Sequence, residues 1–338
     1  MSLMLHTEGN TVKNEKGETV RLLGVNRAGL EWASKDDRIV DSVVYACDVW
    51  HANLIRLPLS QDRWFGRGPE QRETDPDGNC YRSLVAQVVD EIQKRGKYVI
   101  LDLHWSNCNV WGENIGQHSM PDYKSLEFWT DVSKAYKNHP SVLFGLYNEP
   151  RDVSWEVWRN GGTVQERYRD REGNVKHLEY EAPGLQTIAY VIRDSGAVNI
   201  LVIGGLEWAY TLTGIAEGYG IDDNRGNGII YDTHVYPWKY EWDKNVTVIA
   251  DKYPILVGEC GHYGNLAKPR EGAQSDPCEV WVPRLLSWID RHNYHMSAWD
   301  FHPSAGPCLI KNFDNEPTEY WGSYVKEYLQ DKHNKGEI

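Results

Sequence analysis

The chain has 338 residues and a formal net charge of −13, which argues against nucleic acid or an anionic membrane surface as a partner, because both require basic patches. A neutral or cationic substrate fits this charge better. The chain holds 15 Trp and 20 Tyr but only 5 Phe, and flat side chains with a polar handle suit stacking on sugar rings as well as core packing.

The N-terminal part, residues 5–20, has the pattern of a β-hairpin with Glu15-Lys16-Gly17-Glu18 as its turn. We expect this hairpin to close the bottom of the fold that follows. From residue 21 onward the sequence repeats an apolar strand, a polar loop and an amphipathic helix. That alternation is typical of parallel βα units.

Eight apolar runs of strand length follow one another along the chain. They are residues 21–26, 53–59, 98–105, 142–148, 200–204, 229–236, 255–259 and 296–301. Because eight strands close a barrel, the pattern predicts an α/β fold, a single (β/α)8 TIM barrel. Helices are expected between the strands, for example over residues 81–95 and 183–195, each followed by a glycine.

The loops that follow strands are long, and those that follow helices are short, so we expect a cleft at the C-terminal face of the barrel. The longest loop, residues 151–182, contains two strand-like runs, 164–168 and 175–180, that predict a hairpin beside the cleft. No linker or low-complexity tract divides the chain. We therefore expect residues 1–338 to form one domain.

Six cysteines are too few and too scattered for a disulfide scaffold, and no CxxC pair suggests zinc. Two loop pairs, Cys80 with Cys108 and Cys278 with Cys308, are candidates for bridges, whereas Cys47 and Cys260 have the surroundings of buried small hydrophobes. No set of residues has convincing metal-ligand spacing, so we predict neither a metal nor a cofactor.

No apolar run reaches the roughly 18 residues that a membrane-spanning helix needs. The first six residues lack a charged region followed by a long apolar one. We expect a cytosolic protein or, in preference, a secreted mature form whose leader is absent. We expect it to be a monomer.

Two stretches end in a glutamate that is out of place in a buried strand. They are Leu146-Tyr147-Asn148-Glu149-Pro150 and Ile255-Leu256-Val257-Gly258-Glu259-Cys260-Gly261. An unpaired buried charge is costly, so two such carboxylates at strand tips suggest a pair for acid/base or nucleophilic work. The alternative is that each simply accepts hydrogen bonds where its strand meets a loop.

Polar and aromatic groups also mark the ends of the other strands, as in active sites on this architecture. Each is weak evidence alone, since a lone histidine at a strand end is more often structural. The set comprises Arg56, His104, Trp105, Asn148, His234, Tyr236 and Trp299. Asp102 and Asp232 precede the two histidines by two residues, so orienting them is the expected role.

This ordered series resembles glycoside hydrolase family 5, the cellulase and mannanase family. The motifs are Leu54-Ile55-Arg56-Leu57-Pro58, Asp102-Leu103-His104-Trp105, Asn148-Glu149-Pro150, His234-Val235-Tyr236, Val257-Gly258-Glu259 and Trp299. The similarity runs from Arg21 to Trp299. Asn-Glu-Pro alone is shared by a larger clan of barrel glycosidases, but the whole series is specific.

The resemblance implies a role for each position. Glu149 would be the general acid/base, expected to keep its proton at neutral pH because Glu259 is a like charge nearby. Glu259 would be the nucleophile, kept ionised by Arg56 and Tyr236, which implies retention of anomeric configuration. The remaining implied roles are hydrogen bonding to the sugar 2-hydroxyl by Asn148, positioning by His104 and His234, and stacking by Trp299.

Aromatic residues in the loops, among them Trp32 and Trp208, are candidates for a row of stacking sites along a polysaccharide or oligosaccharide. Such a row favours an endo-acting enzyme. The resemblance favours an endo-β-1,4-glucanase, and β-mannanase, xyloglucanase and β-1,3-glucan cleavage stay open. Two further alternatives are a transglycosylase and a barrel that binds glycans without cutting them.

Overall fold

The computed structural model describes residues 4–110, 114–264 and 276–338. Its central feature is a closed barrel of parallel strands in the order β10-β11-β12-β3-β4-β5-β6-β9, which confirms the predicted (β/α)8 barrel. The strands are β3 (Leu23–Asn26), β4 (Leu54–Ser60), β5 (Tyr98–Trp105), β6 (Val142–Gly145), β9 (Leu201–Gly204), β10 (Ile229–Val235), β11 (Ile255–Cys260) and β12 (His295–Ala298). They are almost entirely buried, because the barrel interior covers one face and the helices cover the other.

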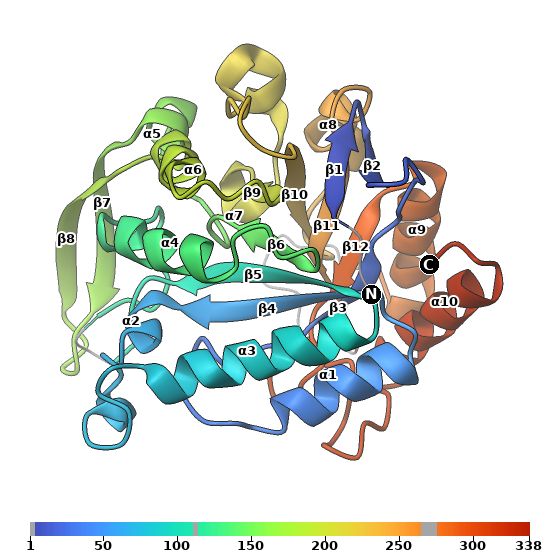
Figure 1. Ribbon diagram of the computed structural model, residues 1–338, viewed down its shortest axis with the longest axis horizontal. Helices are drawn as coiled ribbons and strands as arrows, with labels where there is room; N and C mark the ends of the chain where they lie inside the picture. Colours follow the sequence, from blue (N-terminus) through green and yellow to red (C-terminus); the bar gives the residue numbers. More distant parts are fainter. Residues whose placement is uncertain (1–3, 111–113, 265–275) are drawn as a thin grey trace.

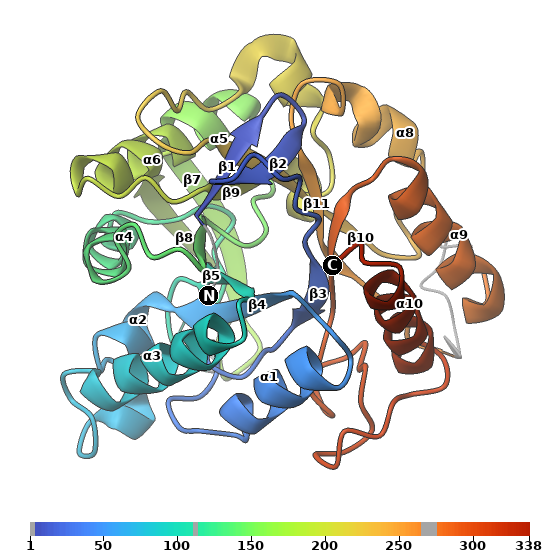
Figure 2. The ribbon, with the colours of Figure 1, turned by 45° about the vertical axis from the view of Figure 1, so that its right-hand side comes forward.

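Helices surround this barrel, as Figure 2 shows. They are α1 (Ile39–Asp48), α2 (Gln61–Trp64), α3 (Asn79–Lys94), α4 (Lys124–Ala135), α5 (Trp155–Asn160), α6 (Leu185–Asp194), α7 (Leu206–Ala209), α8 (Trp242–Asn245), α9 (Cys278–Arg291) and α10 (Gly322–Asn334), with short turns η1 (Pro69–Gln71), η2 (Ile215–Tyr219) and η3 (Thr247–Ile249). In α3, apolar side chains at helical spacing face the barrel. Gly96 follows this helix with φ +69°, a conformation that favours glycine.

A hairpin of β1 (Leu5–Glu8) and β2 (Thr11–Asn14) closes the N-terminal end of the barrel. Leu5 and Val12 are buried in an apolar cluster with side chains from the early part of the barrel strands, such as Leu54 and Ile100. The hairpin lies across the near end of the barrel in Figure 2. Its location was predicted correctly.

The turn of this hairpin was predicted wrongly. The two strands are joined at residues 9–10, and the predicted turn at residues 15–18 is a second one, closed by the bridge between Lys13 and Thr19. The Asn14 side chain stabilises this second turn by accepting hydrogen bonds from the backbone of Lys16 and Glu18. Both segments have turn chemistry, so composition alone did not distinguish them.

A second hairpin, β7 (Gly162–Arg169) and β8 (Val175–Ala182), lies in the long segment after β6. This confirms the prediction of a hairpin within residues 151–182. Figure 1 shows it at the left, beyond the arrowheads of β4 and β5. It therefore stands at the C-terminal end of the barrel, opposite β1–β2.

The predicted disulfide bridges are absent, because all six cysteines, each of them in the described part of the chain, are free thiols. Cys80 is exposed at the start of α3, whereas Cys108 is buried with its sulfur 3.9 Å from an Asp62 carboxylate oxygen. Cys278 is buried in the first turn of α9, and Cys308 is partly buried. The predicted burial of Cys47 and Cys260 is confirmed.

No helix within the described residues combines the length and apolar character needed to cross a membrane.

Candidate active site

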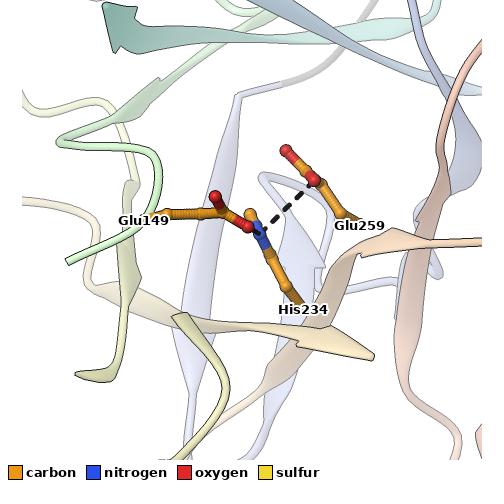
Figure 3. A group of neighbouring side chains, drawn as sticks. All are labelled: Glu149, His234 and Glu259. Carbon is orange, nitrogen blue, oxygen red and sulfur yellow. Dashed lines mark hydrogen bonds and ion pairs between the residues drawn. The ribbon is translucent and has the colours of Figure 1, made fainter. Parts of the chain in front are cut away.

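The two predicted glutamates meet at the C-terminal end of the barrel. Glu259 is part of β11, whereas Glu149 lies in the loop after β6, which ends at Gly145 rather than at residue 148 as predicted. One carboxylate oxygen from each and one ring nitrogen of His234 lie within 4.8 Å of one another. In Figure 3 the imidazole of His234 lies between the two carboxylates.

Glu259 is held from two sides by groups that donate hydrogen bonds. Arg56 Nη1 lies 2.9 Å from Oε1, and the Tyr236 hydroxyl donates to Oε2 at 2.8 Å. The Glu259 side chain is only 6% exposed, so these donors replace the water that the carboxylate loses. Burial and the charge of Glu259 raise the pKa of Tyr236 well above its usual value, so its hydroxyl keeps the proton that it donates.

The residue before Glu259 must be small. A Cβ on Gly258 would lie 2.2 Å from an Asp232 carboxylate oxygen, and that same oxygen accepts a hydrogen bond from the Gly258 backbone at 2.8 Å. The glycine therefore lets the Asp232 carboxylate approach β11 closely.

Arg56 connects several polar residues beneath the carboxylates. Its guanidinium donates to Asn26 at 2.9 Å and to Asn148 at 2.5 Å, and it pairs with Asp102 at 3.0 Å. Asp102 in turn lies 2.8 Å from His104 Nδ1, which agrees with the predicted orienting role. Sequence reasoning missed Asn26, although a polar residue at the end of an apolar strand could have indicated it.

Glu149 is in a different environment. Its side chain is 16% exposed, and its Oε1 lies 3.0 Å from His234 Nδ1. Burial raises the pKa of Glu149, but the hydrogen bond and charge of His234 outweigh this effect, and the net pKa is lowered. This direction is opposite to the raised pKa that we expected for Glu149 from the sequence.

The proton is instead on His234. Burial lowers the pKa of this imidazole, but the negative charges of Glu259 and Asp232, together with hydrogen bonds, raise it to about 10. Nδ1 also lies 3.5 Å from Glu259, and Nε2 lies 3.4 Å from Asp232. A fully buried, charged imidazole thus bridges the two glutamates.

A cavity of about 460 Å³ opens above the carboxylates. It is lined by His104, Asn148, Glu149, Trp208, Tyr236, Trp238, Lys239, Glu259, Tyr263, Trp299 and Gly306. Aromatic stacking shapes its walls, because Trp299 stacks on His104 at 5.4 Å and Trp238 stacks on Tyr236 at 5.0 Å between ring centroids. Sequence reasoning missed Lys239, Tyr263 and Gly306, which lie in loops without a strand-end signal.

Trp208 reaches the cavity from an unusual backbone. It is the middle of three consecutive non-glycine residues with positive φ, Glu207, Trp208 and Ala209. Such a left-handed turn is strained, and here it leaves the indole 45% exposed. The guanidinium of Arg151 lies over the ring, 4.1 Å from its centroid.

Two other predicted binding residues lie elsewhere. Trp32 packs edge-on against His302 at 5.5 Å, and among the described residues neither Trp32 nor Trp105 lines the cavity around the carboxylates. The side chains of Arg56 and His234 lie behind the cavity wall, in contact with the carboxylates.

Within residues 4–110, 114–264 and 276–338, one group has three ligand atoms close enough for a metal ion, and it is Glu149, His234 and Glu259. These are the same side chains that form the carboxylate pair. A cation bound here would displace the proton on His234 and occupy both carboxylates.

The geometry supplies one deep carboxylate with fixed donors and one more exposed carboxylate that shares a proton with an imidazole. Both face a cavity with aromatic walls. This arrangement is suited to nucleophilic attack and proton transfer on either side of one bond.

A family model described as Cellulase (glycosyl hydrolase family 5) matches residues 13–305. The chain is 25% identical to Endoglucanase MaCel5A of Microbulbifer sp. (strain ALW1), over 94% of this chain and 55% of that protein, and 25% identical to an endoglucanase of Paenibacillus polymyxa, over 89% and 80% respectively. The chain thus spans little more than half of the first of these relatives.

Solved structures share the fold. The native β-glucanase SdGluc5_26A from Saccharophagus degradans superposes with a TM-score of 0.73 at 22% identity, covering 98% of this chain and 94% of that one. The same β-glucanase was also solved with cellotetraose bound (TM-score 0.72, 21% identity, 98% and 94% coverage).

Proposed function

Since this chain belongs to the cellulase family, glycosyl hydrolase family 5, we propose that it is a retaining endo-β-1,4-glucanase. The observation that carries this proposal is the pair Glu149 and Glu259, with carboxylate oxygens within 4.8 Å at one aromatic cavity. Retaining enzymes hold their two carboxyl groups about 5–5.5 Å apart, whereas inverting enzymes need about 6.5–9.5 Å to admit a water.

In the first step, Glu259 attacks the anomeric carbon, and the bond from that carbon to the leaving-group oxygen breaks. Glu149 delivers a proton to this oxygen. Because the proton is on His234 before substrate binds, the imidazole passes it to Glu149 through their 3.0 Å contact. In the second step, Glu149 accepts a proton from water, which replaces Glu259 on the sugar.

The surroundings of each carboxylate support nucleophilic attack by Glu259 and proton transfer by Glu149. Arg56 and Tyr236 stabilise the negative charge that Glu259 regains when it leaves. Asn148 lies in the cavity wall, 3.2 Å from His104 Nε2, and would bond the sugar 2-hydroxyl. Trp299 would stack beneath the sugar at the cleavage point.

The substrate class rests on two further observations. The relatives are endoglucanases by name, and two structural neighbours hold cellotetraose. The cavity of this chain is walled by Trp208, Trp238 and Trp299, which suits stacking on consecutive sugars. We further propose that residues 1–338 act as one catalytic unit, outside the cell and as a monomer.

Proton NMR during early hydrolysis of cellohexaose tests the mechanism. The expected first product is the β-anomer, with the α-anomer growing later by mutarotation. Initial release of the α-anomer would overturn the retaining assignment.

A second experiment tests the substrate. Carboxymethylcellulose, lichenan, xyloglucan, glucomannan, galactomannan and a β-1,3-glucan are incubated with the enzyme, and product sizes are scored. We expect a rapid fall in polymer size on β-1,4-glucans. Faster cleavage of galactomannan would make the enzyme a mannanase, and gel retardation without reducing ends would indicate a glycan-binding protein.

A further inference from the structure

A second cavity, of about 740 Å³, lies beside the first one and shares Trp208 with it. Its walls come from the β7–β8 hairpin and from the loops after β5 and β6. The polar side chains that matter below are Arg151, Asp152, Glu166, Arg167 and Arg169.

This cavity lies on the Glu149 side of the active site. Arg151, two residues after Glu149, donates to the Glu149 backbone oxygen at 3.3 Å and covers the Trp208 ring. The acid that protonates a leaving group faces that leaving group. Given the proposed function, on which this inference rests, the second cavity is therefore on the path of the leaving-group part of the polysaccharide.

The charge of this cavity contrasts with that of the chain. Three guanidinium groups and two carboxylates line it, although the chain carries a net charge of −13. One of the carboxylates, Glu166, is buried and already paired with His118 at 2.6 Å. The other, Asp152, has a side chain that is 70% exposed, so water screens it.

The three arginines of this cavity differ in their hydrogen-bond partners. Arg151 donates to the carbonyls of Gln117 and His118 at 2.7 and 3.0 Å, and Arg169 donates to the carbonyl of Gly173 at 2.8 Å. These carbonyls are neutral, and the exposed Asp152 carboxylate lies 3.8 Å from Arg151 Nε. Within the described part of the chain, the exposed Arg167 side chain has no hydrogen bond or ion pair, so its five donors are free for a ligand.

We propose that this cavity binds leaving-group sugars that carry a carboxylate, so that the enzyme prefers β-1,4-glucan segments with acidic residues beyond the cleavage point. Arg167 and Arg169 would pair with the carboxylate, a geometry that guanidinium groups match with two parallel hydrogen bonds. Trp208 would stack on the sugar between the two cavities.

The test compares cellohexaose with the same oligosaccharide oxidised to a carboxylate at C6 of residues near the reducing end. For each protein, kcat/KM on the acidic substrate is divided by kcat/KM on the neutral one. We expect this ratio to exceed 1 for the native enzyme and to fall roughly 10-fold in an Arg167→Gln/Arg169→Gln double variant.

Arg171→Gln is the matched control, because it removes the same charge from the same hairpin at a residue that does not line the cavity. Its ratio should equal that of the native enzyme. Added salt should lower the native ratio, because the carboxylate and guanidinium groups attract one another across partly hydrated space.

A ratio that is at or below 1, or that is unchanged both by the double variant and by salt, would overturn the proposal. An aryl β-cellobioside, which has no sugar on the leaving-group side, separates this failure from failure of the proposed function. If the native enzyme cleaves the aryl cellobioside but the ratio of kcat/KM values fails the tests above, the proposed function stands and only the role of the second cavity is wrong.

Discussion

The two glutamates differ in what holds them. Glu259 is 6% exposed and has two fixed donors, Arg56 and Tyr236, whereas Glu149 is 16% exposed and shares a proton with His234. A nucleophile must be ionised at the moment it attacks, whereas a proton donor must carry a proton at that same moment. Two glutamates therefore have different roles because their neighbouring groups differ.

The strongest test of this contrast removes the charge of the deeper residue. Glu259→Gln keeps the shape but cannot attack carbon, so we expect kcat to fall by roughly 10⁴–10⁶-fold on every substrate. Initial rates on cellohexaose and an aryl cellobioside measure it. Glu207→Gln, an exposed glutamate on the turn that carries Trp208, is the control and should retain activity; equal losses in both variants would refute the assignment.

Removing the proton donor should have an effect that depends on the leaving group. For Glu149→Gln we expect kcat/KM to fall by about 10²–10⁴-fold on cellohexaose, but much less on an aryl cellobioside whose leaving group needs no proton. The two substrates are compared in parallel. Equal losses on both would mean that Glu149 does not act as an acid.

The bridging imidazole should link stability to pH. The pKa of His234 is about 10 in the fold against an ordinary 6.5, so its contribution is complete below about pH 6.5 and is lost as the pH rises toward 10. We expect the free energy of unfolding to fall by roughly 2–5 kcal/mol over this range. Urea unfolding of the native protein measures it.

His234→Asn should flatten that pH dependence, while His177→Asn, at an exposed histidine on β8, should leave it as it is in the native protein. The same alkaline decline in the His234→Asn variant would show that other groups cause it.

The smallest expected effect concerns one hydrogen bond. Tyr236→Phe removes the donor to Glu259 Oε2 but leaves Arg56 on Oε1. Because a hydrogen bond to a charged group is worth about 1.5–3 kcal/mol, we expect kcat to fall by roughly 10–100-fold. Tyr263→Phe, whose hydroxyl donates to the Gly306 carbonyl at the same cavity, should change kcat less; a reversed order would contradict the role of Tyr236.

Much of the fold and site could be predicted because the signals are local. Strands buried on both faces have continuous apolar runs, and a glutamate at the end of such a run stands out, as Glu149 and Glu259 do. The order of the eight strands along the chain brings their ends together once the barrel closes.

The predictions that were wrong depend on distances between side chains, which residue types and their spacing do not determine. The pKa of His234 is raised mainly by the charges of Glu259 and Asp232, which lie 3.5 and 3.4 Å from its ring nitrogens. Trp208 lines the cavity and Trp32 does not, because Trp208 lies within a left-handed turn beside the cavity, whereas Trp32 packs on His302. The two candidate disulfide bridges do not form for a related reason, since neighbouring loops need not bring two sulfur atoms within bonding distance.

The hairpin β1–β2 seals one end of the barrel with its own apolar cluster, while every group with a proposed chemical role lies at the other end. Substitutions in the loops at the C-terminal end of the barrel can therefore change which glycan is cut without weakening the apolar packing at the N-terminal end. Replacing the exposed tip of the β7–β8 hairpin, residues 171–174, should be tolerated, which makes this chain a practical scaffold for laboratory evolution.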